Sequence, residues 1–240
     1  MSTPRIEDAA AAGPLAVAIV GAESTGKSQL AHALAAALAH EFGLRTVVVD
    51  EYLRDWCHER ARTPRADEQM AIAREHAARI AVATARQDID VVLCDTTPLM
   101  VAVYSHLLFD DLALDPVARD CQAGIALTLL TSLDLPWVAD GLQRDGPHVR
   151  TPVDAHVRAR LAAWGTPWSL VSGTGPARVA SALDALRPLL RERARSGHAG
   201  GLFTRLAASQ DGPPAPRWVC ERCDDPACEH LSRSRPGGQP

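Results

Sequence analysis

The sequence predicts an α/β domain in three layers, in which helices cover both faces of a parallel sheet. Short apolar runs without polar alternation recur along the first 195 residues, as expected for strands that are buried on both faces. Amphipathic stretches separate these runs, and such strand–helix repetition is typical of parallel crossover units. The 240 residues suffice for one such domain with its own core and a small appendage.

Five strands and five helices make up the predicted domain. The strands are expected at Leu15–Val20, Arg45–Val49, Val91–Cys94, Ile125–Thr131 and Trp168–Val171. The helices are expected at Ser28–Phe42, Ala66–Arg86, Leu99–Phe109, Val153–Trp164 and Pro176–Arg191. The strands are short and rich in β-branched residues, which favours a sheet interior.

The amino-acid composition changes near Arg195, where glycine and proline become frequent, and this change predicts the domain boundaries. We expect a disordered leader (1–14), the α/β domain (15–195), a Gly/Pro-rich linker (196–217), a small cysteine-rich unit (218–231) and a disordered tail (232–240).

The charge pattern excludes some classes of protein. Of the 25 basic residues, 24 are arginine and one is lysine, Lys27, while 29 acidic residues give a net charge of -4. A mildly acidic chain is not expected to bind nucleic acid over its whole surface. No apolar run is long enough to span a membrane, and Leu15–Val20 is too short for the core of a signal peptide. The expected location is the cytoplasm.

A phosphate-binding loop follows the first predicted strand. It reads Gly21, Ala22, Glu23, Ser24, Thr25, Gly26, Lys27 and Ser28. The two glycines let backbone amides turn inward around an anion, and the following helix adds its positive end. Lysine reaches the β- and γ-phosphates of ATP, and the serine hydroxyl is a ligand for Mg²⁺. The motif therefore predicts a P-loop NTPase fold.

The single lysine of the chain lies inside this loop. A genome-wide preference for arginine explains the other 24 basic residues. A planar, forked guanidinium cannot replace the compact ammonium of Lys27 in a tight phosphate cradle. We therefore expect Lys27 to take part in catalysis.

Carboxylates follow two of the predicted strands. Asp95 ends the apolar run 91–94 and is the expected second Mg²⁺ ligand, through water. Asp50 and Glu51 follow the second strand, where either one, or Asp95, can serve as general base; alternatively they form a favourable acidic helix start. Thr96 and Thr97 bind substrate or metal water, or cap the following helix, and capping is expected of at least one.

A glycine-bounded segment between the fourth strand and the next helix occupies the place of a lid. Its arginines, Arg144 and Arg150, are expected to close over the phosphates and stabilise the transferred charge. The alternative is that they are ordinary solvated surface residues.

Four motifs together carry a resemblance to a known family. In chain order they are residues 21–28, Glu51-Tyr52-x-Arg54, Asp95-Thr96 and Trp137-Val138-x-Asp140-Gly141-Leu142. The chain from about Leu15 to Arg191 resembles the ribosylnicotinamide kinase domain of NadR-like proteins, an AAA-type ATP-binding family of P-loop NTPases that phosphorylates nicotinamide riboside.

The resemblance implies a set of site residues. It places residues 21–28 on ATP and Mg²⁺, Asp95 on Mg²⁺, and Glu51 near the ribose hydroxyls. Substrate binding is implied for Tyr52, Arg54, Gln69, Trp137 and Asp140. Tyr52, Trp56 and Trp137 are candidates to stack on the cationic pyridinium ring, and each has a place in the core as its alternative. The chain lacks the adenylyltransferase and DNA-binding portions of bifunctional members, so only the kinase step is expected.

The cysteines fall into two groups. Cys57, Cys94 and Cys121 are scattered through the domain and are expected to be small core residues rather than disulfides. The remaining four potential ligands are clustered in the tail: Cys220, Cys223, Cys228 and His230. They are enough for one tetrahedral Zn²⁺ site, with free or redox-active thiols and an iron–sulfur cluster as alternatives. We expect this unit to be structural, although nearby arginines leave nucleic-acid contact open.

Together these features predict a kinase that uses ATP and Mg²⁺ to phosphorylate the 5′-hydroxyl of nicotinamide riboside, yielding nicotinamide mononucleotide for NAD salvage. One alternative is a P-loop kinase of another nucleoside-like metabolite. Another is a nucleotide-dependent regulatory ATPase that binds a partner or nucleic acid through its tail. The absence of an extended basic surface favours the enzyme.

Overall fold

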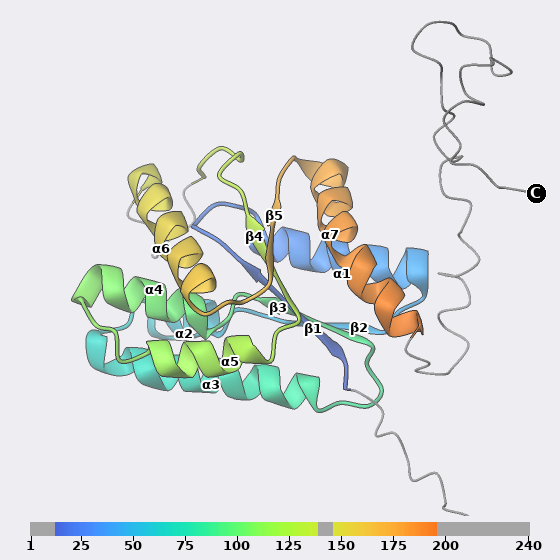
Figure 1. Cartoon of the computed structure of the whole chain (residues 1–240). Coiled ribbons are helices and arrows are strands. Elements are labelled where there is room, and N and C mark those ends of the chain that lie inside the picture. The colour runs from blue at the N-terminus through green and yellow to red at the C-terminus, as the bar shows by residue number, and fades with distance from the viewer. Residues whose placement is uncertain (1–12, 139–145, 196–240) are drawn as a thin grey trace, which may run out of the picture. The chain divides into compact units, whose positions relative to one another are not determined.

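The computed structural model describes residues 13–138 and 146–195, and its central element is a five-stranded sheet (Figure 1). The strands are β1 (Leu15–Val20), β2 (Thr46–Val49), β3 (Val91–Asp95), β4 (Leu127–Thr131) and β5 (Trp168–Val171). They lie in the order β2-β3-β1-β4-β5, and every neighbouring pair is parallel. All five carboxyl ends therefore meet at one edge of the sheet, as the crossover pattern predicts.

Helices cover both faces of this sheet. They are α1 (Lys27–Phe42), α2 (Tyr52–Arg60), α3 (Ala66–Thr84), α4 (Pro98–Phe109), α5 (Asp115–Ala123), α6 (Arg150–Ala163) and α7 (Gly175–Arg195), with a short 3₁₀ helix, η2 (Pro147–Val149). Helices α1 and α7 pack together on one face, while α3, α4, α5 and α6 form the opposite layer (Figure 1). The three-layer α/β fold is thus confirmed. No helix among the described residues is long and apolar enough to cross a membrane.

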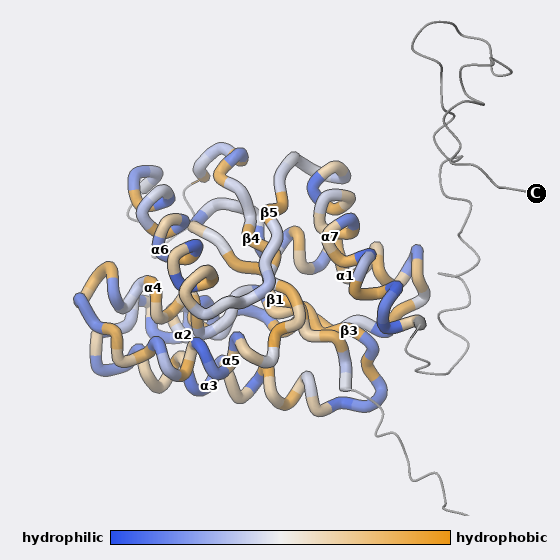
Figure 2. Tube along the Cα trace, in the orientation of Figure 1, coloured by the Kyte–Doolittle hydropathy of each residue, from blue (hydrophilic) through white to orange (hydrophobic). Residues whose placement is uncertain are grey.

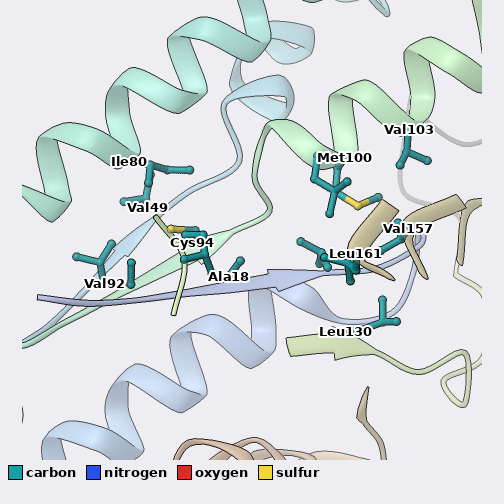
Figure 3. Packing of buried hydrophobic residues seen from close by; sticks show 14 of the residues in the cluster. Ala18, Val49, Ile80, Val92, Cys94, Met100, Val103, Leu130, Val157 and Leu161 are labelled. Carbon is teal, nitrogen blue, oxygen red and sulfur yellow. The ribbon is translucent and has the colours of Figure 1, made fainter. Parts of the chain in front are cut away.

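The core lies on both sides of the central strand. All six residues of β1 are buried, and so are all five of β3 and of β4. Hydrophobic residues occupy much of the trace of β1 and β3 (Figure 2). Ile80 of α3, Met100 and Val103 of α4, and Val157 and Leu161 of α6 pack against the strands in a single cluster (Figure 3). Burial of this apolar surface is the main force that holds the sheet edge in place.

Two helices were not predicted. Helix α2 buries only Trp56 and Cys57, and α5 buries only Ala118 and Gln122. At nine residues each, both helices are too short to repeat an apolar face over several turns, which is the pattern by which a helix is recognised in a sequence. The fourth strand also begins at Leu127, two residues later than expected. By internal contacts the chain divides into residues 1–202 and 203–240, and every described residue lies in the first unit.

Candidate active site

The loop between β1 and α1 depends on two glycines in unusual conformations. Gly21 has a φ of 146°, and a Cβ at this position would lie 2.1 Å from the Thr131 hydroxyl oxygen. Gly26 has a φ of 72° and is the N-cap residue of α1. The first N–H groups of α1 have no partner within the helix, so this end is a site for an anion. The predicted phosphate loop therefore has the expected strand–loop–helix geometry.

Buried hydroxyls connect the loop to β4. The Thr25 hydroxyl donates to the Ala22 carbonyl over 2.7 Å. The Thr131 hydroxyl oxygen lies 2.7 Å from that of Thr25 and 3.1 Å from the Val20 carbonyl oxygen. Both threonines are fully buried. Sequence reasoning missed Thr131, although a threonine at the carboxyl end of an apolar strand is a usable signal for such a role.

A buried arginine fastens the loop to α7. One terminal nitrogen of Arg178 donates to the Thr25 carbonyl over 2.8 Å, and the other donates to Asp134 and to the Gly173 carbonyl, each over 2.8 Å. Arg178 is 4% exposed. Its charge is therefore held directly behind the phosphate loop. In a chain with 24 arginines, nothing in the sequence marks this one.

The predicted metal ligands lie together at the sheet edge. The Ser28 hydroxyl interacts with the Asp95 carboxylate as a hydrogen-bond partner, and Oδ1 of that carboxylate is buried without a partner. The Lys27 ammonium donates to the Ala22 carbonyl over 2.9 Å. A hydroxyl and an unsatisfied carboxylate oxygen beside a phosphate cradle are the donor set that Mg²⁺ prefers. Residues Ser28 and Asp95 therefore fit a magnesium ion.

Two carboxylates share this environment. Burial raises the pKa of Asp95, and its hydrogen bond from Ser28 and the nearby Lys27 charge oppose that rise. Burial also raises the pKa of Glu51. The nearby Lys27 charge opposes this rise, and the Asp95 charge adds to it. Raised pKa values are typical of carboxyl groups in a catalytic cleft. The Lys27 ammonium thus acts on the pKa of both carboxyl groups, and the Asp95 charge acts on that of Glu51.

Two cavities open on either side of Lys27. The first, about 570 Å³, is lined by the phosphate loop together with Leu135, Pro136 and Val138. The second, about 530 Å³, is lined by Glu51, Gln69, Thr96 and side chains of α4. Lys27 and Arg54 line both cavities. Both cavities are large enough for a ligand, and they share two cations. A ligand in each cavity could therefore contact the same anionic group from opposite sides.

The threonines after β3 do not cap α4 with their side chains. Thr97 is the N-cap residue of α4, but its hydroxyl donates to the Gln122 side-chain oxygen over 3.1 Å. Thr96 lines the second cavity with a φ of 68°, a left-handed conformation that is rare for a β-branched residue. The prediction that at least one of them supplies a side-chain cap is wrong, because Thr97 holds the N-cap position without a side-chain cap hydrogen bond.

The aromatic residues predicted to stack on a ligand are distributed differently from expectation. Trp56 is buried at 5% exposure in the core, and the guanidinium groups of Arg60 and Arg62 lie 4.5 and 4.9 Å from its ring centre. The Tyr52 ring is likewise covered by Arg79 at 4.2 Å. Neither aromatic lines a cavity. Trp56 therefore takes the place in the core that is its alternative, and an arginine guanidinium lies over each of the two rings.

Sequence reasoning missed the aromatic wall of the second cavity. Tyr104 and Phe109 line it, together with Met100 and Leu108 of the same helix. These residues belong to the expected helix 99–109, which looks like an ordinary core element because it is apolar on every side. No signal in the sequence distinguishes the part of α4 that faces the cavity.

The Trp-Val motif begins directly over the phosphate loop. The Ser24 hydroxyl donates to the Val138 carbonyl over 2.6 Å and accepts from the Val138 amide over 3.0 Å. This pair joins two motifs that are 114 residues apart, as expected if both serve one site. Trp137 is half-buried and adjacent, whereas Asp140 and Arg144 lie outside the described residues.

Arg150 does not lie on an extended loop. It is the first residue of α6, 8% exposed, and its Nη1 donates to the Leu135 carbonyl over 2.9 Å. Its Nε and Nη2 are buried without a hydrogen-bond partner. The expected place of Arg150 on a lid segment is therefore corrected to the start of a helix, and its alternative as a solvated surface residue is wrong, because the side chain is buried behind the wall of the first cavity. A buried guanidinium with unused donors is suited to an anion.

The cysteines of the domain are core residues, as predicted. Cys57 and Cys94 are buried, Cys121 is half-buried, and none of the three forms a disulfide. Burial raises the pKa of the Cys121 thiol to about 11, so it remains protonated at neutral pH. Within residues 13–138 and 146–195, no group of three potential ligands is placed to hold a metal ion. The predicted zinc ligands Cys220, Cys223, Cys228 and His230 lie outside the described residues.

Solved structures share this fold. NadR in complex with NAD and AMP-PNP superposes with a TM-score of 0.59 at 19% identity, covering 73% of this chain and 49% of that chain. NadR in complex with NR superposes with a TM-score of 0.59 at 18% identity, covering 73% of this chain and 50% of that chain. The thymidylate kinase of Ehrlichia chaffeensis superposes with a TM-score of 0.52 at 17% identity, covering 74% of this chain and 99% of that chain. The chain thus spans about half the length of NadR.

The expected resemblance to NadR is confirmed at the level of the fold, which this chain shares with NadR and with the thymidylate kinase. No curated protein sequence matches the chain. A family model described as an AAA domain matches residues 16–178, from the first strand of the sheet to the arginine that fastens the phosphate loop. The match covers more than half of the sequence, and the chain belongs to this AAA domain family.

Proposed function

We propose that the protein is an ATP- and Mg²⁺-dependent kinase that transfers the γ-phosphoryl group to the 5′-hydroxyl of nicotinamide riboside. The observation that carries this proposal is the pair of cavities that share Lys27 and Arg54. A kinase needs a nucleotide site and an acceptor site that meet at the transferred group, with positive charge at the meeting point. The product would be nicotinamide mononucleotide, a step of NAD salvage in the cytoplasm.

The first cavity is the proposed nucleotide site. Residues 21–28 would cradle the phosphates, and Lys27 would exchange its bond to the Ala22 carbonyl for the β- and γ-phosphate oxygens. Ser28 and Asp95 would hold Mg²⁺, which neutralises charge that develops on the phosphates. Arg178 keeps the Thr25 carbonyl turned back into the protein, so that it does not point at the anion.

The second cavity is the proposed acceptor site. Glu51 follows β2 at the sheet edge and lines this cavity, where it can accept from the ribose hydroxyls. Tyr104 and Phe109 provide an aromatic wall for the pyridinium ring, and aromatic faces attract such cations. This wall takes over the stacking role first expected of Tyr52 and Trp56. Arg54 and Gln69 complete the predicted substrate residues that line the cavity.

Glu51 is the proposed general base. Of the three candidate carboxylates, Asp50 is exposed and lies 3.4 Å from His32, and Asp95 is committed to Ser28. Glu51 alone of the three lines the acceptor cavity. In the transfer, the 5′-oxygen forms a bond to the γ-phosphorus, the bond to the β–γ bridging oxygen breaks, ADP leaves, and the hydroxyl proton passes to Glu51.

Cations on the nucleotide side would stabilise the charge in transit. Arg150 is the proposed contributor among the described residues, because its buried guanidinium has two nitrogens without a partner. Arg144, on the same predicted lid segment, is proposed as a second. Arg54 lines both cavities and would contact the moving phosphoryl group from the acceptor side.

The test is phosphorylation of a nucleoside panel that includes nicotinamide riboside, with ATP and Mg²⁺, read by product mass. The expected result is nicotinamide mononucleotide formed in proportion to ADP. Phosphorylation of another nucleoside alone would refute the substrate and keep the reaction class. ATP hydrolysis that is stimulated by nucleic acid, with no phosphorylated nucleoside, would instead favour a regulatory ATPase.

The tail is proposed to hold one structural Zn²⁺ through Cys220, Cys223, Cys228 and His230. Metal analysis of the purified protein and of the Cys220→Ser variant tests this. About one zinc per chain is expected in the first and markedly less in the second. Equal metal content in both would refute the site.

A further inference from the structure

Gln69 has a side-chain carbonyl oxygen that is buried without a hydrogen-bond partner, and the residue lines the acceptor cavity. The residue is 3% exposed, and its Oε1 is buried with no partner. Buried amides are nearly always paired, because losing water without gaining a partner costs free energy. An unpaired amide oxygen on a residue that lines a cavity is therefore a group prepared for a ligand.

A second glutamine shows what a purely structural role looks like in this protein. Gln122 is 1% exposed, and both ends of its amide are paired: the oxygen accepts from the Thr97 hydroxyl over 3.1 Å, and the nitrogen donates to the Thr128 hydroxyl. Gln122 does not line the acceptor cavity. The two glutamines are equally buried, so burial alone does not explain the unpaired state of Gln69.

The position of Gln69 suits the ring end of a nucleoside. It lies in the second turn of α3, on the buried side of a helix that packs against α4. Met100, Tyr104 and Phe109 of α4 line the same cavity as an apolar and aromatic wall. Lys27 lines this cavity and the first one, and Glu51 lines this cavity within the electrostatic influence of Lys27, so both mark its phosphate end. A flat ring against α4 would thus carry its polar substituent to Gln69 while the ribose reaches the phosphate end.

We propose that Gln69 is the residue that selects a carboxamide over a carboxylate on the acceptor ring, a proposal that rests on the function given above. A primary amide carries one acceptor oxygen and one donor nitrogen, so two amides can form two N–H···O bonds to each other. A carboxylate offers only acceptors, so its second oxygen faces the Gln69 oxygen and one bond is lost. Gln69 therefore favours nicotinamide riboside over nicotinic acid riboside.

The test compares kcat/KM for these two ribosides in the wild type, in Gln69→Leu and in the matched control Gln122→Leu. The wild type is expected to prefer the carboxamide, and Gln69→Leu to lose about 10- to 100-fold of kcat/KM on it and clearly less on the carboxylate, which has only one bond to lose. Gln122→Leu is expected to lower the unfolding temperature and to keep the wild-type preference ratio.

Binding of each riboside without ATP, measured by calorimetry, supplies a readout other than turnover and should show the same loss of discrimination. Gln69→Met, which nearly preserves side-chain length, replaces leucine if circular dichroism shows that Gln69→Leu is unfolded. One outcome is that the wild type phosphorylates nicotinamide riboside and the Gln69 variants keep its preference ratio between the two ribosides. This outcome overturns the role of Gln69 and leaves the proposed function standing. A wild-type enzyme inactive on both ribosides but active on another nucleoside overturns the proposed function as well.

Discussion

His76 is predicted to make the stability of the protein depend on pH. It lies on the buried side of α3 at 1% exposure, and neither ring nitrogen has a hydrogen-bond partner. Burial, with a smaller contribution from the Arg79 charge, lowers the pKa of His76 from 6.5 to about 4. The folded protein therefore keeps this imidazole neutral under conditions in which the unfolded chain would protonate it.

The magnitude follows from linkage between protonation and folding. The pKa of His76 is lower in the folded state, so the unfolded chain binds more protons between pH 6.5 and about 4. The free energy of unfolding is unaffected by His76 above this window and falls as the pH decreases through it. At about 1.4 kcal/mol per pKa unit, the full loss is about 3 kcal/mol.

The assay is urea denaturation of the wild type and of His76→Leu at several pH values from 7.5 to about 4. Leucine has a similar volume, does not titrate and leaves no unpaired nitrogen, so the variant is expected to be at least as stable at pH 7. The difference between the two proteins should grow by about 3 kcal/mol as the pH falls. Parallel pH profiles for the two proteins would refute the reasoning, because other titrating groups are common to both.

Three further predictions concern the phosphate loop. Lys27→Arg is expected to lower phosphoryl transfer by about 100-fold or more with an unchanged circular dichroism spectrum, because a guanidinium does not fit the cradle; near-normal turnover would contradict this. Gly21→Ala is expected to cost about 1–3 kcal/mol in urea denaturation, since its Cβ would lie 2.1 Å from the Thr131 hydroxyl; unchanged stability would show that the loop relaxes freely. Arg178→Met leaves Asp134 without its buried partner and is expected to cost about 2 kcal/mol or more, together with weaker ATP binding by calorimetry; unaltered ATP affinity would separate Arg178 from the loop.

The sheet and the phosphate loop could be predicted because their signals are local. Strands β1, β3 and β4 are buried on both faces and appear in the sequence as continuous apolar runs. The loop depends on residues 21–28 alone, and its glycines have the positive φ angles that the motif requires. Asp95 could be placed beside it because parallel strands deliver their carboxyl ends to one edge.

The walls of the site could not be predicted because they depend on contacts between distant segments. Arg178 and Thr25 are separated by 153 residues, yet one hydrogen bond joins them. Trp56 looks like a ligand-stacking residue in the sequence, whereas Arg60 and Arg62 of its own neighbourhood cover its ring. Which side of an aromatic ring is free is decided by packing and not by residue type.

The sharing of Lys27 and Arg54 by both cavities has a consequence for inhibitor design. On the proposed function, a single molecule in which adenosine and a pyridine riboside are joined through a polyphosphate chain would fill both spaces and place its negative charge on these two cations. Tethering makes the second half bind at a high effective concentration, so such a compound should bind far more tightly than ATP and nucleoside taken separately. The length of the phosphate chain that binds best would then measure how far apart the two substrates are held.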